Sequence, residues 1–225
     1  MSEGIKRKKV QEVSPRVASC LPVAGMFFCL SGLLFVNPDA IAADGDKLWD
    51  WEAMPVTKAT YDQKHVRLTT DGHGGAIMVW QDHRSGDWDI YAQRLDYDGN
   101  PLWTDDGVII ATSTTNRQLA PEITHDGAGG AVVTWWTRIG TSQYDPWMVF
   151  AQRINASGAV QWTANGVQVS TDVHITPTIL PLNNLSITTD TARGAFMAFE
   201  TATAARVVHI NGSGVLLGPG WTVSI

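Results

Sequence analysis

The sequence predicts an all-β fold made of antiparallel four-stranded blade repeats, arranged as a partial, about three-bladed, β-propeller-like array. A segment of roughly 50 residues recurs, its apolar runs have the composition and two-residue period of strands, and glycine-rich turns separate these runs. After residue 43, no stretch combines a three-to-four-residue apolar period with helix caps. We therefore expect almost no helix.

Residues 1–42 are interpreted as a signal peptide. Five basic residues accompany an apolar run from Val17 to Val36, and Ala40-Ile41-Ala42 fits a small-x-small cleavage site. The alternative is a retained membrane anchor, because the run approaches the ~20 residues that span a bilayer. Prolines and glycines in and after the run weaken a long helix and favour cleavage. We expect a protein that is secreted, periplasmic or on the cell surface.

The composition after cleavage excludes several classes of site and partner. Both cysteines, Cys20 and Cys29, lie in the signal, which excludes a disulfide framework, a thiolate metal site and a cysteine nucleophile. Of the 16 basic and 22 acidic residues, 11 and 19 remain, so the net charge changes from −6 to −8. This acidic chain is not expected to bind nucleic acid or, once the signal is removed, a membrane.

The repeat divides the rest of the chain into units. The first clear copy runs from Asp71 to Trp103, and its second copy begins at Asp126. Gly75, Ala76 and Trp80 return 55 positions later, and Ala92, Gln93, Arg94, Gly99, Trp103 and Gly107 return 59 positions later. A third, degenerate copy contains Gly194, Ala195 and Phe199. We expect a partial leading unit at 43–62 and blade repeats at 63–117, 118–181 and 182–225, with an insertion near Leu180 to Asn184 acting as a linker.

Each unit is expected to contain four antiparallel strands. In the first unit these are Val66–Thr70, Ala76–Trp80, Asp89–Leu95 and a strand that ends in Trp103, followed by an extended piece at 107–110. The glycines of Asp71–Gly75 can adopt positive φ, which predicts a tight hairpin turn. The second strand is almost continuously apolar, which predicts burial on both faces. Trp80, Trp103, Trp135 and Trp162 are expected between blades.

The motifs GGAxxxWxDxR and DIYAQRLDxxGxxLW resemble the repeat of exported bacterial β-propeller proteins, and are distantly similar to sialidase-like and other Asp-turn propellers. The first motif is carried by Trp80, Asp82 and Arg84 in the first unit. The second unit keeps the tryptophan and Arg138 without the aspartate, and the third unit lacks the motif. The resemblance covers the chain from about residue 47 and implies four-stranded blades.

Three units and a fraction do not close a ring of the usual size, since propellers have at least four blades. Three arrangements follow: the chain is a fragment of a longer array, it forms a partial propeller, or two chains complete one ring. Open sheet edges template association. Self-association through these edges is therefore one expected kind of interaction.

The candidate ligand-binding residues lie in the loops after the second strands. Asp82, Asp87 and Asp89 form the densest polar group, and carboxylates of this kind can bind Ca²⁺, although no metal or other cofactor site is assigned. The structural alternative pairs Asp82 with Arg84 and places the other two in turns. The remaining candidates are Trp88, Trp136, Arg138 and Trp147, whose aromatic faces could stack on sugar rings or simply cover loops.

No catalytic residue is assigned, because the sequence contains none of the common nucleophile, zinc or phosphate-loop motifs. The expected function is a non-catalytic binding or scaffold module that recognises glycan or protein through its blade loops. The alternative is a glycoside hydrolase of the sialidase-like kind, or a fragment of one. Such an enzyme needs two facing carboxylates, whose separation a sequence does not reveal.

Overall fold

A computed structural model describes residues 22–23, 26–28, 34–35, 55–142, 144–170, 185–201 and 204–224. The chain divides into two compact units, Met1–Leu48 and Trp49–Ile225. In the first, β1 (Pro22–Val23), β2 (Met26–Phe28) and β3 (Leu34–Phe35) form a small antiparallel sheet. Most of the predicted signal peptide and the insertion at 180–184 lie outside the described residues. None of the described segments forms a helix long and apolar enough to cross a bilayer.

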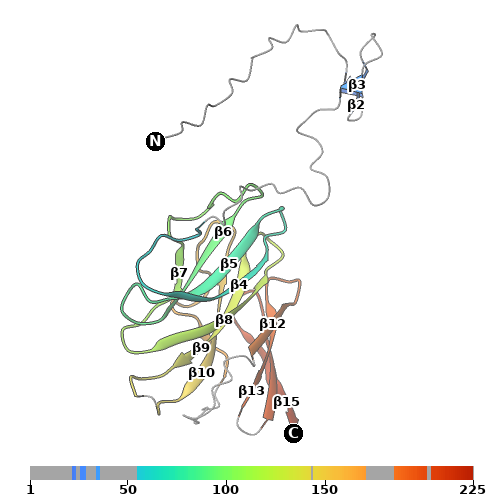
Figure 1. Cartoon of the computed structure of the whole chain (residues 1–225). Helices are drawn as coiled ribbons and strands as arrows, with labels where there is room; N and C mark the ends of the chain where they lie inside the picture. The colour runs from blue at the N-terminus through green and yellow to red at the C-terminus, as the bar shows by residue number, and fades with distance from the viewer. Residues whose placement is uncertain are drawn as a thin grey trace, which may run out of the picture. The chain divides into compact units, whose positions relative to one another are not determined.

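The second unit consists of three antiparallel four-stranded sheets, each with its strands in chain order (Figure 1). The first sheet contains β4 (Gln63–Thr70), β5 (Ala76–Asp82), β6 (Asp89–Leu95) and β7 (Val108–Ala111). The second contains β8 (Arg117–His125), β9 (Ala131–Arg138), β10 (Trp147–Ile154) and β11 (Val167–Gln168). The third contains β12 (Leu185–Thr189), β13 (Ala195–Glu200), β14 (Ala204–Ile210) and β15 (Leu216–Ser224). The predicted all-β class of blade-like sheets is confirmed, and the described residues contain no helix.

The fourth strand was predicted in the wrong place. The segment that ends in Trp103 forms only an isolated bridge between Leu95 and Pro101, and β7 occupies the edge instead. The reason is the side chain of Gln93, whose Oε1 accepts a hydrogen bond from the backbone N–H of Trp103 at 3.0 Å. The amide side chain thus replaces a ladder partner, and the chain turns back before β7 begins.

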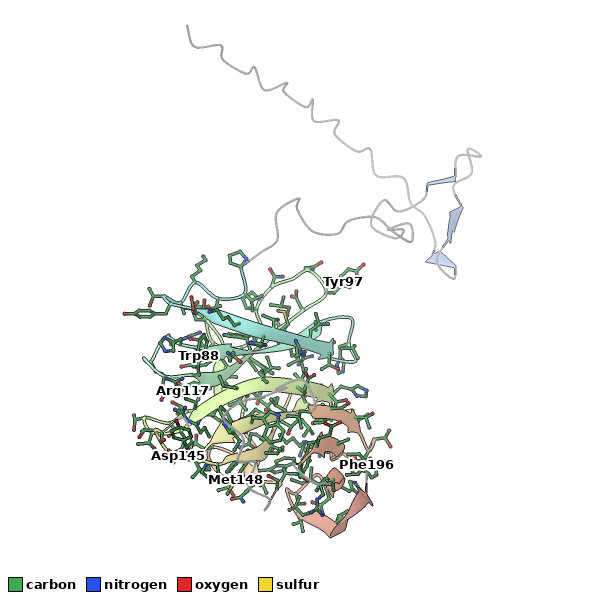
Figure 2. The ribbon with its side chains drawn as sticks, turned by 60° about the horizontal axis from the view of Figure 1, so that its bottom comes forward. Trp88, Tyr97, Arg117, Asp145, Met148 and Phe196 are labelled. Carbon is green, nitrogen blue, oxygen red and sulfur yellow. The ribbon has the colours of Figure 1, made fainter. Side chains whose placement is uncertain are left out.

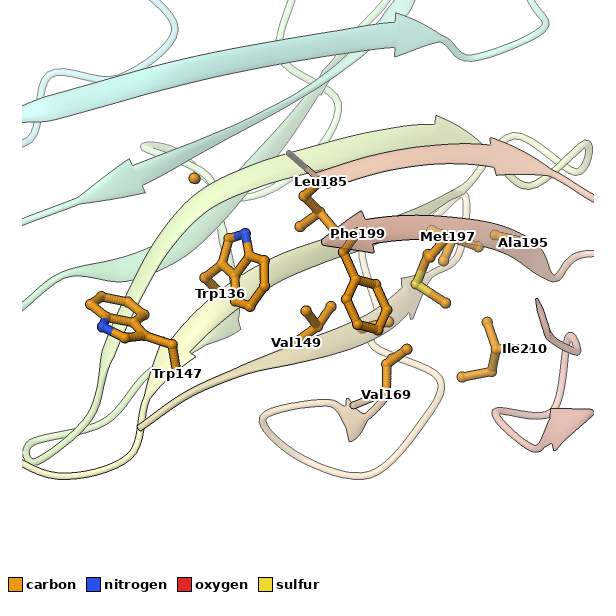
Figure 3. Packing of buried hydrophobic residues seen from close by; sticks show 12 residues of the cluster. Trp136, Trp147, Val149, Val169, Leu185, Ala195, Met197, Phe199 and Ile210 are labelled. Carbon is orange, nitrogen blue, oxygen red and sulfur yellow. The ribbon is translucent and has the colours of Figure 1, made fainter. Parts of the chain in front are cut away.

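Successive sheets pack face to face through large apolar side chains. All eight residues of β9 are buried, which confirms the predicted burial of this strand on both faces. Because neighbouring residues of a strand point to opposite faces, Val133 and Trp135 enter the core shared with the first sheet. Val132 and Trp136 enter the core shared with the third sheet. Figure 3 shows Trp136 beside Phe199 in this second core.

A polar contact repeats at each junction between sheets. The carbonyl oxygen of Ala156 accepts hydrogen bonds from Arg94 Nη1 at 3.1 Å and from Trp103 Nε1 at 3.0 Å. At the next junction the same arrangement joins Gly212 O to Arg153 Nη1 and Trp162 Nε1. Both Arg and Trp of one sheet therefore dock on a single turn of the next sheet. The positions beneath the indoles are glycines with positive φ, Gly158 and Gly214, where an added Cβ would lie within 3 Å of the ring.

Replacing Trp135 by alanine should destabilise the protein strongly, because its fully buried side chain fills the core between the first two sheets. We expect a loss of about 3–5 kcal/mol in the free energy of unfolding, measured by urea unfolding. Tyr144→Ala is the control, since Tyr144 is 63% exposed, and should change stability by less than about 0.5 kcal/mol. Equal effects of the two substitutions would contradict the packing described here.

Candidate functional site

The loops that carry the candidate residues lie together at one end of the sheets. We call this the loop end and define it as loops 83–88 and 112–116 together with residues 139–142 and 144–146. The backbone N–H of Gln118 donates to Trp88 O at 2.9 Å, and that of Gly140 donates to Asn116 Oδ1 at 3.0 Å. Figure 2 shows Trp88, Arg117 and Asp145 along one side of the molecule, with Tyr97 and Phe196 on the other side. The antiparallel strand order places these loops together, because each joins or precedes strands at the same end.

Asp82 and Arg84 form a closed structural unit beneath this end. Asp82 is fully buried and accepts hydrogen bonds from Trp80 Nε1 at 2.8 Å and from the Arg84 backbone and guanidinium at 2.6–2.9 Å. Burial raises the pKa of Asp82, but the bonds from Arg84 and Trp80 outweigh it and lower the pKa below its ordinary value. The Arg84 guanidinium also stacks on Tyr91 at 4.0 Å. These groups hold the first sheet together.

Asp89 is also fully buried, at the first residue of β6. Its oxygens accept hydrogen bonds from the Ser85 hydroxyl at 2.7 Å and from the Ser113 backbone N–H at 3.1 Å. Burial raises the pKa of this carboxyl group, which favours its neutral form. Asp89 thus ties loop 83–88 to loop 112–116 and has no contact with solvent.

Trp136, Arg138 and Trp147 are buried as well. Trp136 makes an edge-to-face contact with Phe199 at 6.2 Å, and the Arg138 guanidinium lies 6.0 Å from the ring of Trp147. The 59-residue offset relates Trp147 to Trp88. The two equivalent indoles differ in solvent exposure. Trp147 belongs to the core between the second and third sheets, whereas Trp88 is only half-buried.

Two accessible candidates, Asp87 and Trp88, belong to what we call the Trp88 cluster, defined as Lys64, His83, Asp87, Trp88 and Arg117. The His83 ring lies 4.8 Å from the Trp88 ring, and Lys64 Nζ lies 5.5 Å from it. Arg117 Nε approaches Asp87 Oδ1 at 3.4 Å, from the start of the neighbouring sheet. Lys64 Nζ also pairs with Asp62 Oδ2 at 2.6 Å. The partly exposed indole therefore lies beside two cations, each of which is paired with an aspartate.

Lys64 and Arg117 were not among the residues predicted from the sequence. The hairpin register could have identified Lys64, because a tight turn at residues 71–75 brings the start of the first strand opposite the end of the second. In the structure Lys64 pairs with Gln81, and Gln118 pairs with Thr137. The described residues contain no group of three or more His, Cys, Asp or Glu placed to hold a metal ion, and Ca²⁺ binding stays a prediction.

The opposite end of the sheets carries buried charges at the Asp turns. Asp71 Oδ1 accepts hydrogen bonds from the backbone N–H groups of His73 and Gly75 at 2.7 and 2.8 Å, and Oδ2 pairs with Arg94 at 2.8 Å. Asp126 pairs in the same way with Arg153. In the third sheet a histidine takes the place of the arginine, and His209 Nε2 lies 2.9 Å from Asp190 Oδ2. These charged side chains are therefore occupied by contacts within the protein.

The pKa values of two of these aspartates reflect the turn geometry. Burial raises the pKa of Asp71, but the hydrogen bonds from His73 and Gly75 and the Arg94 guanidinium more than offset it. Burial likewise opposes ionisation of Asp190, and the hydrogen bond from His209 contributes to a net lowering of its pKa. The folded state therefore favours both carboxylates in their ionised form.

No protein-family model matches the sequence, and no curated protein matches it. Shared blade-like architecture does not by itself specify an activity. The function is therefore inferred from the loop end. All eight predicted ligand-binding residues lie in the described part of the chain, and of these only Arg84, Asp87 and Trp88 are accessible to solvent.

The Asp turns predict acid sensitivity. A carboxylate with a lowered folded-state pKa stabilises the fold above its unfolded pKa, about 3.9 for aspartate, and loses this contribution as the pH falls. We expect the free energy of unfolding to decrease below about pH 4. Asp71→Asn should weaken this dependence and lower stability at pH 7 by about 1–3 kcal/mol.

The measurement is urea unfolding at a series of pH values. Asp98→Asn is the matched control, because Asp98 is exposed in the turn at 96–100, and its change should stay within about 0.5 kcal/mol. If the free energy of unfolding of Asp71→Asn falls below pH 4 as steeply as that of the wild type, the Asp71–Arg94 contact does not contribute to stability.

Proposed function

We propose that this protein is an exported binding module of the β-propeller type that recognises glycan or protein through the loop end and carries out no catalysis of its own. The observation that supports this proposal is the Trp88 cluster. It places a partly exposed indole beside two cations at the junction of two sheets. The propeller assignment is supported by three successive four-stranded sheets packed face to face.

The chemistry of the cluster suits a glycan. An indole offers a large apolar face on which a sugar ring can stack, together with an N–H donor. Lys64 and Arg117 are both exposed, and each would have to exchange its aspartate, Asp62 or Asp87, for a carboxylate of the ligand. An arginine guanidinium can bind a carboxylate with two parallel hydrogen bonds. An acidic surface segment of a protein would present the same groups.

The carboxylates at this end favour binding over hydrolysis. Glycoside hydrolases need two carboxyl groups that flank the substrate, roughly 5–9.5 Å apart. Asp82 and Asp89 are fully buried, and both are occupied by hydrogen bonds within the protein. One observation favours the hydrolase as a second candidate: burial raises the pKa of Asp89, as a general acid requires. Loop 83–88 would have to move before this group could reach a substrate.

The test is a glycan array followed by titration of the best ligand. Trp88→Ala and Arg117→Ala should each weaken binding by about tenfold to a hundredfold, the range expected for aromatic and arginine anchors. Tyr97→Ala is the control, because Tyr97 is an exposed aromatic residue on the opposite side (Figure 2). Equal affinity in all three variants would exclude the Trp88 cluster as the binding site.

The same glycans should be assayed for released sugar. We expect no hydrolysis by the wild-type protein. If the wild-type protein releases sugar and Asp89→Asn does not, the protein is a glycoside hydrolase and the binding-module proposal is wrong. Sugar release that persists in this variant would place catalysis elsewhere in the chain.

A further inference from the structure

The Trp88 cluster adjoins an exposed tyrosine, Tyr61, in the segment that precedes β4. The ring of Tyr61 is 73% exposed, the largest value among the exposed apolar and aromatic side chains of the described residues. It lies 6.4 Å from the ring of His83 in an edge-to-face arrangement, and the His83 ring lies 4.8 Å from that of Trp88. Three rings thus follow one another from the segment before β4 to loop 83–88. We call Tyr61, His83 and Trp88 the aromatic row.

The backbone at Tyr61 is strained. Its φ angle is +70°, which is rare for a bulky residue that has a Cβ atom. The backbone N–H of His83 donates to Asp62 O at 3.0 Å. On the same segment, Gln63 Nε2 donates to Thr60 O at 3.2 Å. Strained residues persist where their surroundings fix them, and they cluster at ligand sites. Here the strain holds a ring that is exposed, so packing of the core does not account for it.

The second unit has no such row at the equivalent positions. The 55-residue offset relates Tyr61 to Asn116 and His83 to Arg138. Asn116 Oδ1 accepts a hydrogen bond from the backbone N–H of Gly140 at 3.0 Å, and Arg138 is buried. The same positions therefore serve the fold in the second unit and carry accessible rings in the first. The fold of a unit does not require aromatic residues there.

The ionic groups around the aromatic row compensate one another. Lys64 Nζ lies 2.6 Å from Asp62 Oδ2, and Arg117 Nε lies 3.4 Å from Asp87 Oδ1. A charged ligand would have to separate one of these pairs and leave an aspartate or a cation without its partner. A hydroxyl group would not, because ammonium, guanidinium and carboxylate groups each have more hydrogen-bonding sites than one ion pair uses. The charges therefore favour an uncharged, hydroxyl-rich ligand.

We propose that the loop end binds an uncharged linear polysaccharide, with one sugar ring stacked on Tyr61 and another ring of the same chain on Trp88. This inference rests on the proposed glycan-binding function and specifies its ligand. The rings contact the apolar faces of the sugars, and the two ion pairs contact hydroxyl groups at their edges. Two stacking positions favour a chain over a single sugar, because the second contact is made within a complex that has already formed.

Titration with uncharged linear oligosaccharides of glucose, mannose and xylose, from the monosaccharide to the hexasaccharide, tests the inference. For the best of these series, affinity should rise with length and should be the same at low and high salt, because an uncharged ligand makes no screened charge contact. Oligosaccharides of galacturonic acid of the same lengths carry one carboxylate on each sugar. They should bind more weakly by about tenfold or more.

Substitution of Tyr61 tests its place in the site. Tyr61→Ala should weaken binding of the hexasaccharide by about tenfold and remove most of the gain in affinity with length. Tyr61→Phe should bind as the wild type does, because it keeps the ring face. Tyr97→Ala is the matched control, since Tyr97 is an exposed tyrosine on the opposite side of the molecule (Figure 2). Circular dichroism of each variant establishes that it is folded.

The results distinguish this inference from the function on which it rests. If Trp88→Ala weakens binding and Tyr61→Ala does not, the aromatic row is not the binding surface. If the acidic oligosaccharides bind more tightly and salt releases them, the ligand is charged. In both cases the loop end remains a binding site and only the inference is wrong. If no glycan binds, or if neither Trp88→Ala nor Arg117→Ala changes the affinity, the glycan-binding function itself is wrong.

Discussion

The fold depends on the burial of indole rings between successive sheets. A four-stranded sheet has two faces, and its strands are stable only when the apolar face is covered. In the second sheet both faces are covered, with Trp135 toward the first sheet and Trp136 toward the third. The sheets therefore stabilise one another in sequence, as in repeat proteins where each unit contacts its neighbours. Among the described residues, the second sheet shares a core with both of the other sheets, and the first and third sheets each share a core with the second.

This dependence determines which polar residues are available for function. Charges at repeated positions serve the fold, because Arg94 and Arg153 each join an Asp turn to a carbonyl oxygen of the following sheet. Residues at the loop end are less constrained. The equivalent residues Trp88 and Trp147 illustrate the difference: one has Lys64 and His83 beside it at the surface, and the other is enclosed by the third sheet. The same position of the repeat is therefore at the surface in one unit and buried in the next.

Much of the architecture could be predicted from the sequence, since glycine turns and apolar runs determine strands locally. The bounds of β6 match the predicted run Asp89–Leu95. The fourth strand could not be predicted, because a Gln93 side chain, and not a backbone pattern, determines where the chain turns. Trp136 was expected to stack on a sugar ring or to cover a loop. It is buried instead, because neighbouring residues of a strand point to opposite faces and both faces of β9 are covered. Lys64 and Arg117 required the register of β4 and β8, which includes irregularities in both pairings.

The degeneration of the third unit follows the same logic. Its Asp turn is intact: Asp190 caps the backbone N–H groups of Ala192 and Gly194, and His209 retains the contact that an arginine makes elsewhere. The positions that have changed are those that reach a following sheet, where histidine and glycine replace the arginine and tryptophan donors. Phe196 stacks on His209 at 4.1 Å and covers it. Interactions within the sheet are thus kept, whereas the arginine and tryptophan donors that join each of the other two sheets to the next one are replaced.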